Sequence, residues 1–185
     1  PWSELPHFRT LPLAELSVAD TEALVRERLA GHTELQAYFS LIVERSAGNP
    51  FFAEELVHSL KEKSASLLAS GHPASALALS LPATVQAVIG ERIDRLVVTQ
   101  KTLLHICAVI GKEIPLVVLQ DVAVFLISQL ESGLEGLCEA ELLQLLLEIA
   151  GGRRFTFRHP LIQEVAYNTQ LKARRANRYA EAVER

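Results

Sequence analysis

Apolar residues recur at helical spacing in the first part of the chain, and breaks in that pattern mark where helices begin and end. Ser17 has the side chain of an N-cap and precedes a pattern that predicts a helix to about residue 30. A second helix is predicted over residues 33–47. Its apolar residues fall on one face: Leu35, Phe39, Ile42 and Val43. Residues 8–13, ahead of both helices, form an extended lead-in or an edge strand, because two prolines limit their pairing.

A glycine and a proline separate the second helix from a third. Gly48 ends the second helix, and Pro50 suits the first turn of the next one, where its missing N–H costs nothing. The third helix is expected to fade near residue 63. Its core-facing stripe is Phe52, Leu56, Val57 and Leu60.

Residues 64–80 are rich in Ser, Ala, Gly and Pro, which predicts a flexible connection and the best internal boundary. Beyond it, Pro82 begins a helix predicted over residues 83–96. The apolar side of this helix is Val85, Val88, Ile89, Ile93 and Leu96. Arg92 and Arg95 are expected on its other faces.

The last part of the chain combines helices with one hairpin signal. Helices are predicted over residues 100–110, 115–123, onward to about 132, 134–143, 160–169 and 171–184. Two apolar runs, residues 145–149 and 155–158, flank a glycine turn and predict a β hairpin. Helices followed by a hairpin indicate a winged helix, a helix-turn-helix variant with a β wing. The fold class is therefore predicted to be mainly α, ending in a winged-helix-like domain with one small β hairpin.

Composition bounds the class of protein. The chain has 185 residues, 49% of them hydrophobic and 22% charged, which is typical of a globular protein of one medium or two small domains. No apolar run reaches the roughly 18 residues needed to span a bilayer, and the N-terminus lacks the features of a signal peptide. We therefore expect a cytoplasmic protein without membrane contact. Because the chain begins with Pro and contains no Met, we expect it to be a piece of a larger protein.

No pattern for independent catalysis or metal binding stands out. The six histidines show no ligand spacing, and there is no Gly-x-Ser-x-Gly elbow. The phosphate-binding pattern Gly-x-x-x-x-Gly-Lys-Ser/Thr is also missing, so we expect no catalytic residue, no metal ligand and no cofactor for this chain alone. Cys107 and Cys138 lie in apolar helical patterns and are interpreted as buried reduced thiols, with a disulfide as the alternative.

Charge argues against nucleic-acid binding. The net charge is −4, and the segment that would read DNA, residues 134–142, carries three carboxylates and no Lys or Arg. Basic residues do gather near the end: Arg153, Arg154, Arg158, Lys172, Arg174, Arg175 and Arg178. We interpret them as a solvated, partly ion-paired surface. A contact surface for the rest of a larger protein and a nucleic-acid surface remain alternatives.

Two motifs each have a simple structural interpretation. In residues 48–52, Gly-Asn-Pro-Phe-Phe, the glycine ends one helix, the proline begins another, and the aromatic residues enter the core. In residues 155–167 a strand runs into a helix, and His159 stands at the helix start as a cap. A histidine there is favourable when it is neutral or faces an anion, because the helix dipole is positive at that end. A phosphate would suit both the dipole and the imidazole.

Taken in order, several motifs resemble the region that follows the ATPase core in STAND proteins. The resemblance is strongest to the AAA-type module of bacterial multidomain adenylate/guanylate cyclases and LuxR-like regulators, and it covers nearly the whole chain. The motifs lie at residues 48–56, 81–86, 92–96, 108–112 and 155–167.

The resemblance implies domains, ligands and roles. Residues 1–63 would be the helical lid, 64–80 the linker, and 81–185 the winged-helix-like domain. Gly48 would shape a turn from which Pro50 packs on adenine, and His159, with Arg158 beside it, would sense the β-phosphate of ADP. The switch would be closed with ADP and would open when ATP replaces it.

The same resemblance implies partners and an activity for the intact parent. The partners would be a P-loop domain of the same polypeptide, binding ADP or ATP with Mg, and an effector domain such as a cyclase. The chain itself would be a regulatory, non-catalytic part of a signalling protein, a class III adenylate cyclase homologue. Two alternatives stay open: a DNA-binding transcriptional regulator of LuxR-like type, and a protein-interaction scaffold without a nucleotide role.

Overall fold

The computed structural model describes residues 7, 9–70, 81–123, 128–149 and 152–170. The described chain is mainly helical and carries a small three-stranded antiparallel sheet, which confirms the predicted mainly α class. It divides into two compact units, residues 1–85 and 86–185, and each is described by itself. The predicted boundaries had placed the end of the first domain at residue 63.

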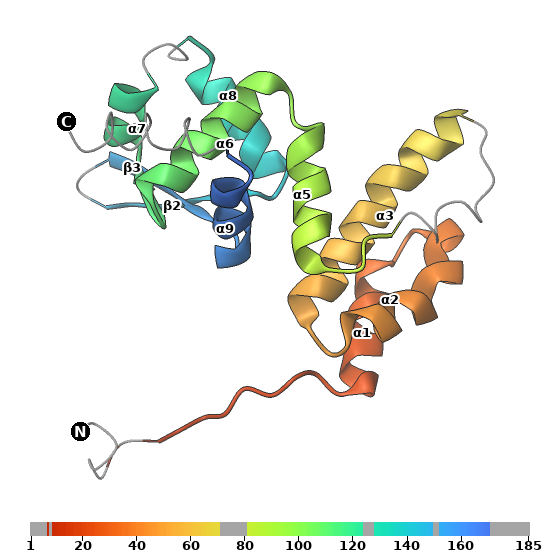
Figure 1. Cartoon of the computed structure of the whole chain (residues 1–185). Coiled ribbons are helices and arrows are strands. Elements are labelled where there is room, and N and C mark those ends of the chain that lie inside the picture. The colour runs from red at the N-terminus through yellow and green to blue at the C-terminus, as the bar shows by residue number, and fades with distance from the viewer. Residues whose placement is uncertain (1–6, 8, 71–80, 124–127, 150–151, 171–185) are drawn as a thin grey trace. The chain divides into compact units, whose positions relative to one another are not determined.

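The first unit is a set of helices packed around one core. Its elements are α1 (Val18–Arg28), the 3-10 helix η2 (Thr33–Tyr38), α2 (Phe39–Ser46) and α3 (Pro50–Ser70). The three α-helices contact one another pairwise (Figure 1). The largest fully buried side chains of this unit are Leu29, Leu35, Ile42, Leu56 and Leu60. The stripe predicted for the third helix is buried in full, from Phe52 to Leu60.

Helix ends in the first unit follow the predicted capping chemistry, with two differences. Ser17 caps α1 as predicted, because its Oγ accepts a hydrogen bond of 3.1 Å from the Asp20 amide. The predicted second helix is split into η2 and α2. The third helix does not fade near residue 63: α3 continues to Ser70, because residues 64–70 contain good helix formers and no Gly or Pro. The rest of the predicted linker, residues 71–80, lies outside the described residues.

Where the described chain resumes, it is held against α2. The Arg45 guanidinium donates to the Leu81 carbonyl at 2.6 Å, and both Leu81 and Pro82 are buried. Residues 81–82 therefore belong structurally to the first unit, although the sequence pattern assigned them to the second domain.

The second unit combines helices with the sheet. Its elements are α5 (Val85–Arg95), α6 (Val98–Ile110), β1 (Glu113–Pro115), α7 (Leu116–Val122), α8 (Leu130–Glu139), β2 (Leu143–Ile149), β3 (Gly152–Phe157) and α9 (Pro160–Asn168). The strand order is β1-β3-β2, and both neighbouring pairs are antiparallel. Helix α6 packs against α7, α8 and α9, while α7 and α9 contact β3.

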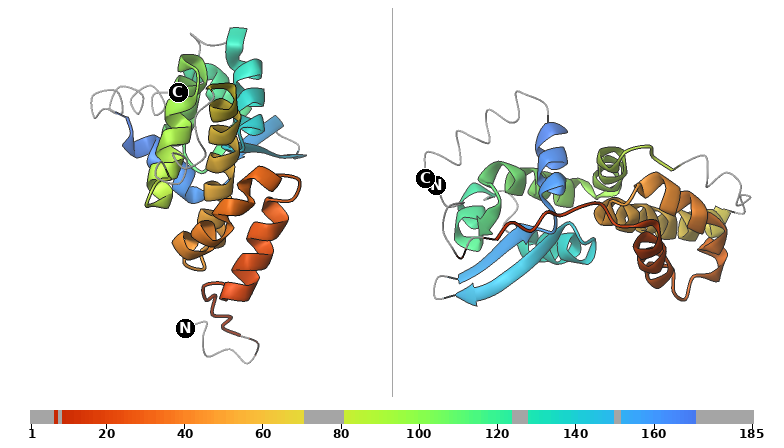
Figure 2. Two further views of the ribbon diagram at one scale, coloured as in Figure 1. Left: turned by 90° about the vertical axis from the view of Figure 1, so that its right-hand side faces the viewer. Right: turned by 90° about the horizontal axis from the view of Figure 1, so that it is seen from below.

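The predicted hairpin is present. Strands β2 and β3 pair with Leu143 opposite Phe157 and Leu145 opposite Phe155, and Figure 2 shows them side by side. An irregularity in register falls between Leu146 and Ile149. Phe155 and Phe157 are buried, so the strand predicted from its apolar residues contributes to the core.

Two features of the second unit differ from the prediction. Strand β1 was missed, whereas the helix predicted over residues 115–123 is present as α7, with Pro115 as its N-cap and as the last residue of β1. One helix, α8, replaces the predicted stretches ending at residue 132 and spanning 134–143, because the chain turns at Glu141, where φ is +54°, and enters β2 at Leu143. The predicted helix over residues 171–184 lies outside the described residues.

Arg92 was predicted on an outer face of its helix and is instead buried. Only 5% of its surface is exposed, and its guanidinium donates to the Ala140 carbonyl at 2.5 Å. This bond ties α5 to the end of α8. The apolar pattern could not indicate it, because the partner is a backbone carbonyl 48 residues away.

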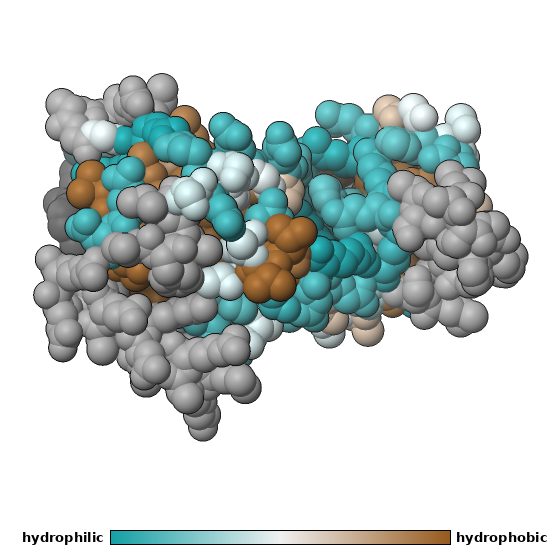
Figure 3. Space-filling model, turned by 90° about the horizontal axis from the view of Figure 1, so that it is seen from above, coloured by the Kyte–Doolittle hydropathy of each residue, from teal (hydrophilic) through white to brown (hydrophobic). Residues whose placement is uncertain are grey.

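Several large apolar side chains of the described residues are exposed. The face in Figure 3 is largely hydrophilic, with apolar groups interspersed. The most exposed are Leu11, Leu13 and Val18 in the first unit and Val98 in the second. Of the helices described, none has the length and apolar character to cross a membrane.

Candidate functional site

The turn between α2 and α3 is built from two residues with left-handed backbone. Ala47 has φ of +48° and Gly48 has φ of +79°. Asn49 then caps α3, since its Oδ1 accepts a hydrogen bond of 3.0 Å from the Phe52 amide. Pro50 follows as the first helical residue, as predicted. No role was predicted for Asn49, although Asn before Pro at a helix start is a capping signal.

Glycine is required at position 48 for a second reason: the chain segment before α1 passes very close to this turn. Its carbonyl accepts a hydrogen bond of 2.8 Å from the Leu16 amide. A Cβ atom at position 48 would lie 2.7 Å from the Leu16 carbonyl oxygen, closer than real contacts allow. Glycine therefore lets the chain before α1 lie directly on the turn before α3.

Pro50 and its neighbours differ in exposure. Pro50 is exposed, Phe51 is half-buried, and Phe52 is 8% exposed and belongs to the core. Pro50 thus presents its ring to solvent at the start of α3, where another molecule or domain can contact it. The ring has no described binding partner.

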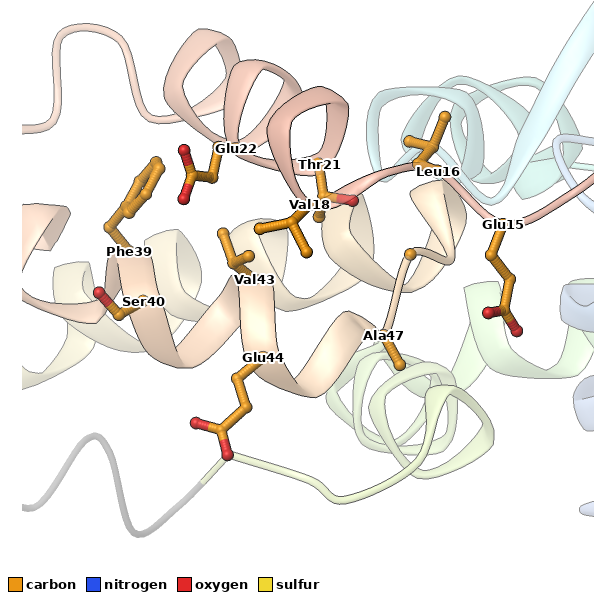
Figure 4. Close-up of a pocket in the computed structure, with 11 residues that line it drawn as sticks. Glu15, Leu16, Val18, Thr21, Glu22, Phe39, Ser40, Val43, Glu44 and Ala47 are labelled. Carbon is orange, nitrogen blue, oxygen red and sulfur yellow. The ribbon is translucent and has the colours of Figure 1, made fainter.

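A groove of about 520 Å³ lies beside this turn, between the lead-in, α1 and α2. Figure 4 shows Glu22 near Phe39, Val18 facing Val43, and Ala47 close to the α2–α3 turn. Gly48 lines the groove and Pro50 does not. Glu15, Glu22 and Glu44 are its only charged lining residues, so it is acidic throughout.

In the second unit, His159 is the N-cap of α9. Its Nδ1 accepts a hydrogen bond of 3.2 Å from the Leu161 amide, which confirms the capping interpretation. This bond requires an unprotonated Nδ1 and so places the proton of the neutral ring on Nε2. The half-buried imidazole is therefore held with an N–H donor at the positive end of a helix.

Arg158, next to His159, is exposed and lies beside a carboxylate. Its Nη1 is 3.3 Å from Glu141 Oε1, and the two side chains are 43% and 48% exposed. Its amide donates to the Leu142 carbonyl, which joins the end of β3 to the start of β2. The Glu141 side chain was not singled out in the sequence, and it is the residue that most directly competes with an anion for Arg158.

The predicted ion pairing of the basic residues is confirmed where they are described. Arg153 pairs with Glu131, Arg154 with Glu113 at 3.4 Å, and Arg158 with Glu141. These pairs are exposed, so each contributes about 1 kcal/mol or less. Helix α8 exposes Glu131, Glu135 and Glu139 and carries no Lys or Arg. The predicted basic residues at positions 172–178 lie outside the described residues.

Other chemistry is limited in the part of the chain that the structure describes. Within it, no group of three or more potential ligands could hold a metal ion. Cys107 and Cys138 are free thiols; Cys107 is fully buried and Cys138 half-buried. Burial raises the pKa of the Cys107 thiol to about 12, so it is neither nucleophilic nor a thiolate ligand at neutral pH.

The four candidate residues fall into two pairs, one in each unit. Gly48 and Pro50 shape the α2–α3 turn of the first unit, and Arg158 and His159 stand at the start of α9 in the second. Comparison with models of protein families, with curated proteins and with solved structures found no match.

Proposed function

We propose that this chain is the helical lid and winged-helix part of a STAND-type, nucleotide-dependent signalling protein. In this proposal it is regulatory and non-catalytic, and it reports whether ADP or ATP occupies a P-loop domain of the same polypeptide. Pro50 packs on the adenine, and His159 and Arg158 face the β-phosphate. The effector is a cyclase domain, so the intact protein is a class III adenylate cyclase homologue.

The geometry of His159 carries the proposal. The Leu161 amide fixes the His159 imidazole at the positive end of α9, next to Arg158. Helix N-termini favour anions, and a nearby guanidinium strengthens that preference. A phosphate oxygen supplied by a neighbouring domain would meet the positive end of α9 beside the imidazole and would compete with Glu141 for Arg158.

The order of elements in the second unit supports a winged-helix-like arrangement. Helix α6 is followed by a short strand, two helices and a hairpin. The short strand, β1, pairs with the edge of β3 opposite to the edge that pairs with β2. This is the order of a helix-turn-helix unit with a β wing. In such an arrangement α8 is the second helix of the helix-turn-helix, the position that reads DNA in transcription factors.

The first unit supports the adenine part of the proposal. The groove that Gly48 lines contains only acidic charges, so it repels phosphates and leaves the uncharged base as the nucleotide part that can approach this turn. Pro50 is exposed beside it and offers an apolar ring for stacking. The phosphates and Mg would be held by the P-loop domain.

The experiment that tests the proposal is nucleotide binding by the full-length protein. ADP affinity and basal effector activity are measured in the wild type and in Pro50→Ala and His159→Ala. Weaker ADP retention with raised basal activity supports the proposal, because loss of ADP contacts destabilises the closed state. Unchanged affinity and activity in both variants would favour a scaffold without a nucleotide role.

A DNA-binding regulator is the competing function, and α8 argues against it. Its three exposed glutamates would face the phosphate backbone if this helix entered the major groove. Duplex DNA titrated with the chain at low and high salt separates the two functions. Binding that weakens steeply with salt would favour the regulator.

A further inference from the structure

The groove in the first unit is elongated and has an apolar floor. In Figure 4, Phe39 and Glu22 lie toward one end, Val18 and Val43 face each other near the middle, and Leu16 and Glu15 lie toward the other end. Its volume of about 520 Å³ is within the range of roughly 300–1,000 Å³ found for ligand sites. Val18 is 69% exposed, so the floor includes apolar surface that the unit itself leaves uncovered.

Phe39 and Val43 were predicted to share one helix face with Leu35 and Ile42. Leu35 and Ile42 are buried, whereas Phe39 and Val43 are only half-buried and line the groove. The apolar face of this helix is therefore wider than the core beneath it. The apolar residues that the core does not cover, Phe39 and Val43, face the groove rather than the interior.

The charges around this apolar floor are uncompensated. Glu15, Glu22 and Glu44 make no side-chain hydrogen bond or ion pair with any described residue. Arg26, on the same helix as Glu22, places its guanidinium over the Phe39 ring, 5.4 Å from the centroid, so one positive charge lies at the Phe39 end of the groove against three carboxylates. Three like charges around one groove repel one another, and this repulsion is relieved when a cation enters.

We propose that this groove is a docking site for a basic, partly apolar segment of a protein partner. Arginine and lysine place aliphatic stems on apolar surface while their charged heads reach carboxylates. Such a segment would lay its stems and apolar residues along Val18 and Val43. Its charges would meet Glu15, Glu22 and Glu44. This inference does not rest on the nucleotide proposal: the groove shares Gly48 with the candidate adenine site, but Pro50 and His159 do not line it.

Other occupants fit the groove less well. A nucleotide phosphate would be repelled by all three carboxylates. A metal ion or a free polyamine would use the charges but not the apolar floor. A protein segment uses both, which is why charge complementarity and exposed apolar surface together favour it.

The test is fluorescence anisotropy with the whole chain and a short labelled peptide in which arginine alternates with leucine. Glu22→Gln combined with Glu44→Gln removes two groove charges. Glu27→Gln is the matched control, because Glu27 is exposed on α1 outside the groove. We expect Glu22→Gln and Glu44→Gln each to weaken peptide binding about two- to five-fold. We expect the control Glu27→Gln to change peptide binding less than about two-fold. All variants should melt like the wild type, since none of these carboxylates has a described partner.

A second peptide and competition by a small polyamine make the result decisive. Replacing leucine by glycine should also weaken binding to the wild-type chain, because the apolar floor then loses its contact. Equal binding of the glycine peptide, equal competition by spermine, or an equal loss in Glu27→Gln would mean non-specific cation binding and would overturn the proposal. Self-association that the groove substitutions abolish, without peptide binding, would make a second copy the occupant and would also overturn it.

Discussion

The Leu16 amide donates to the Gly48 carbonyl at 2.8 Å, and this bond fastens the chain before α1 to the turn before α3. The same closeness leaves no room for a side chain at position 48. A glycine that the sequence marks as a helix stop is therefore also the packing partner of a segment more than thirty residues earlier. Both the candidate adenine site and the acidic groove depend on this turn.

Gly48→Ala should destabilise the first unit by about 1–3 kcal/mol. A positive φ costs a non-glycine residue about 1 kcal/mol, and the clash with the Leu16 carbonyl adds to it. Gly31→Ala is the matched control: Gly31 has φ of +82° but nothing within 4 Å of an added Cβ. Thermal melts of both variants separate the cost of the positive φ from the cost of the clash with the Leu16 carbonyl. Equal melting temperatures for the two variants would contradict the packing role of Gly48.

Arg92→Met should destabilise the second unit by about 1–3 kcal/mol. The substitution removes the bond to the Ala140 carbonyl at a site that is 5% exposed, and a buried carbonyl that loses a donor is costly. Arg95→Met, on the same helix, removes an exposed pair with Glu91 and should cost less than about 0.5 kcal/mol. Urea unfolding of both variants measures the difference. A smaller effect for Arg92 than for Arg95 would show that the buried bond contributes little.

The two cysteines should differ in reactivity. Cys107 is fully buried with a pKa raised to about 12, whereas Cys138 is half-buried. A thiol reagent at neutral pH should modify Cys138 first and Cys107 only as fast as the second unit opens. Mass spectrometry of a time course measures the order. Faster modification of Cys107 would contradict its burial.

The raised pKa of Cys107 also predicts a pH dependence. Because the folded-state pKa is above the unfolded value, the unfolded state loses its proton first as pH rises. The contribution of Cys107 to the free energy of unfolding is therefore complete below about pH 8.5. Above that pH it declines by up to about 1.4 kcal/mol per pH unit. Urea unfolding across this range should show a shallower decline in Cys107→Ala than in the wild type. Parallel declines would mean that other groups carry the dependence.

Local chemistry predicted the helix ends better than it predicted the partners of polar side chains. Ser17 and Pro50 act within a few residues of themselves, so their roles can be derived from neighbouring sequence. The bond from Arg92 to Ala140 joins positions 48 apart, and no periodicity encodes it. Strand β1 was missed because three residues are too few for an alternation pattern.

The contacts of the candidate site also fall into local ones, which the neighbouring sequence predicts, and distant ones, which depend on the fold. The cap formed by His159 was predictable, because its donor is the Leu161 amide two residues later. The pairing of Arg158 with Glu141 depends on how β2 and β3 meet, and the acidic groove depends on which face of α2 the core leaves uncovered.

The central claim is that His159 contacts ADP, and substitutions that separate this role from capping test it most directly. Asparagine at position 159 can keep the cap on α9 but lacks the imidazole, whereas alanine loses both, at about 1 kcal/mol for the cap. The measurement is the ADP affinity of the full-length protein by calorimetry in the wild type, His159→Asn and His159→Ala, with melting temperatures beside it. The account predicts that both variants lose about 10-fold or more in ADP affinity while only His159→Ala melts earlier. Wild-type affinity in His159→Asn would contradict it and leave His159 as a cap alone.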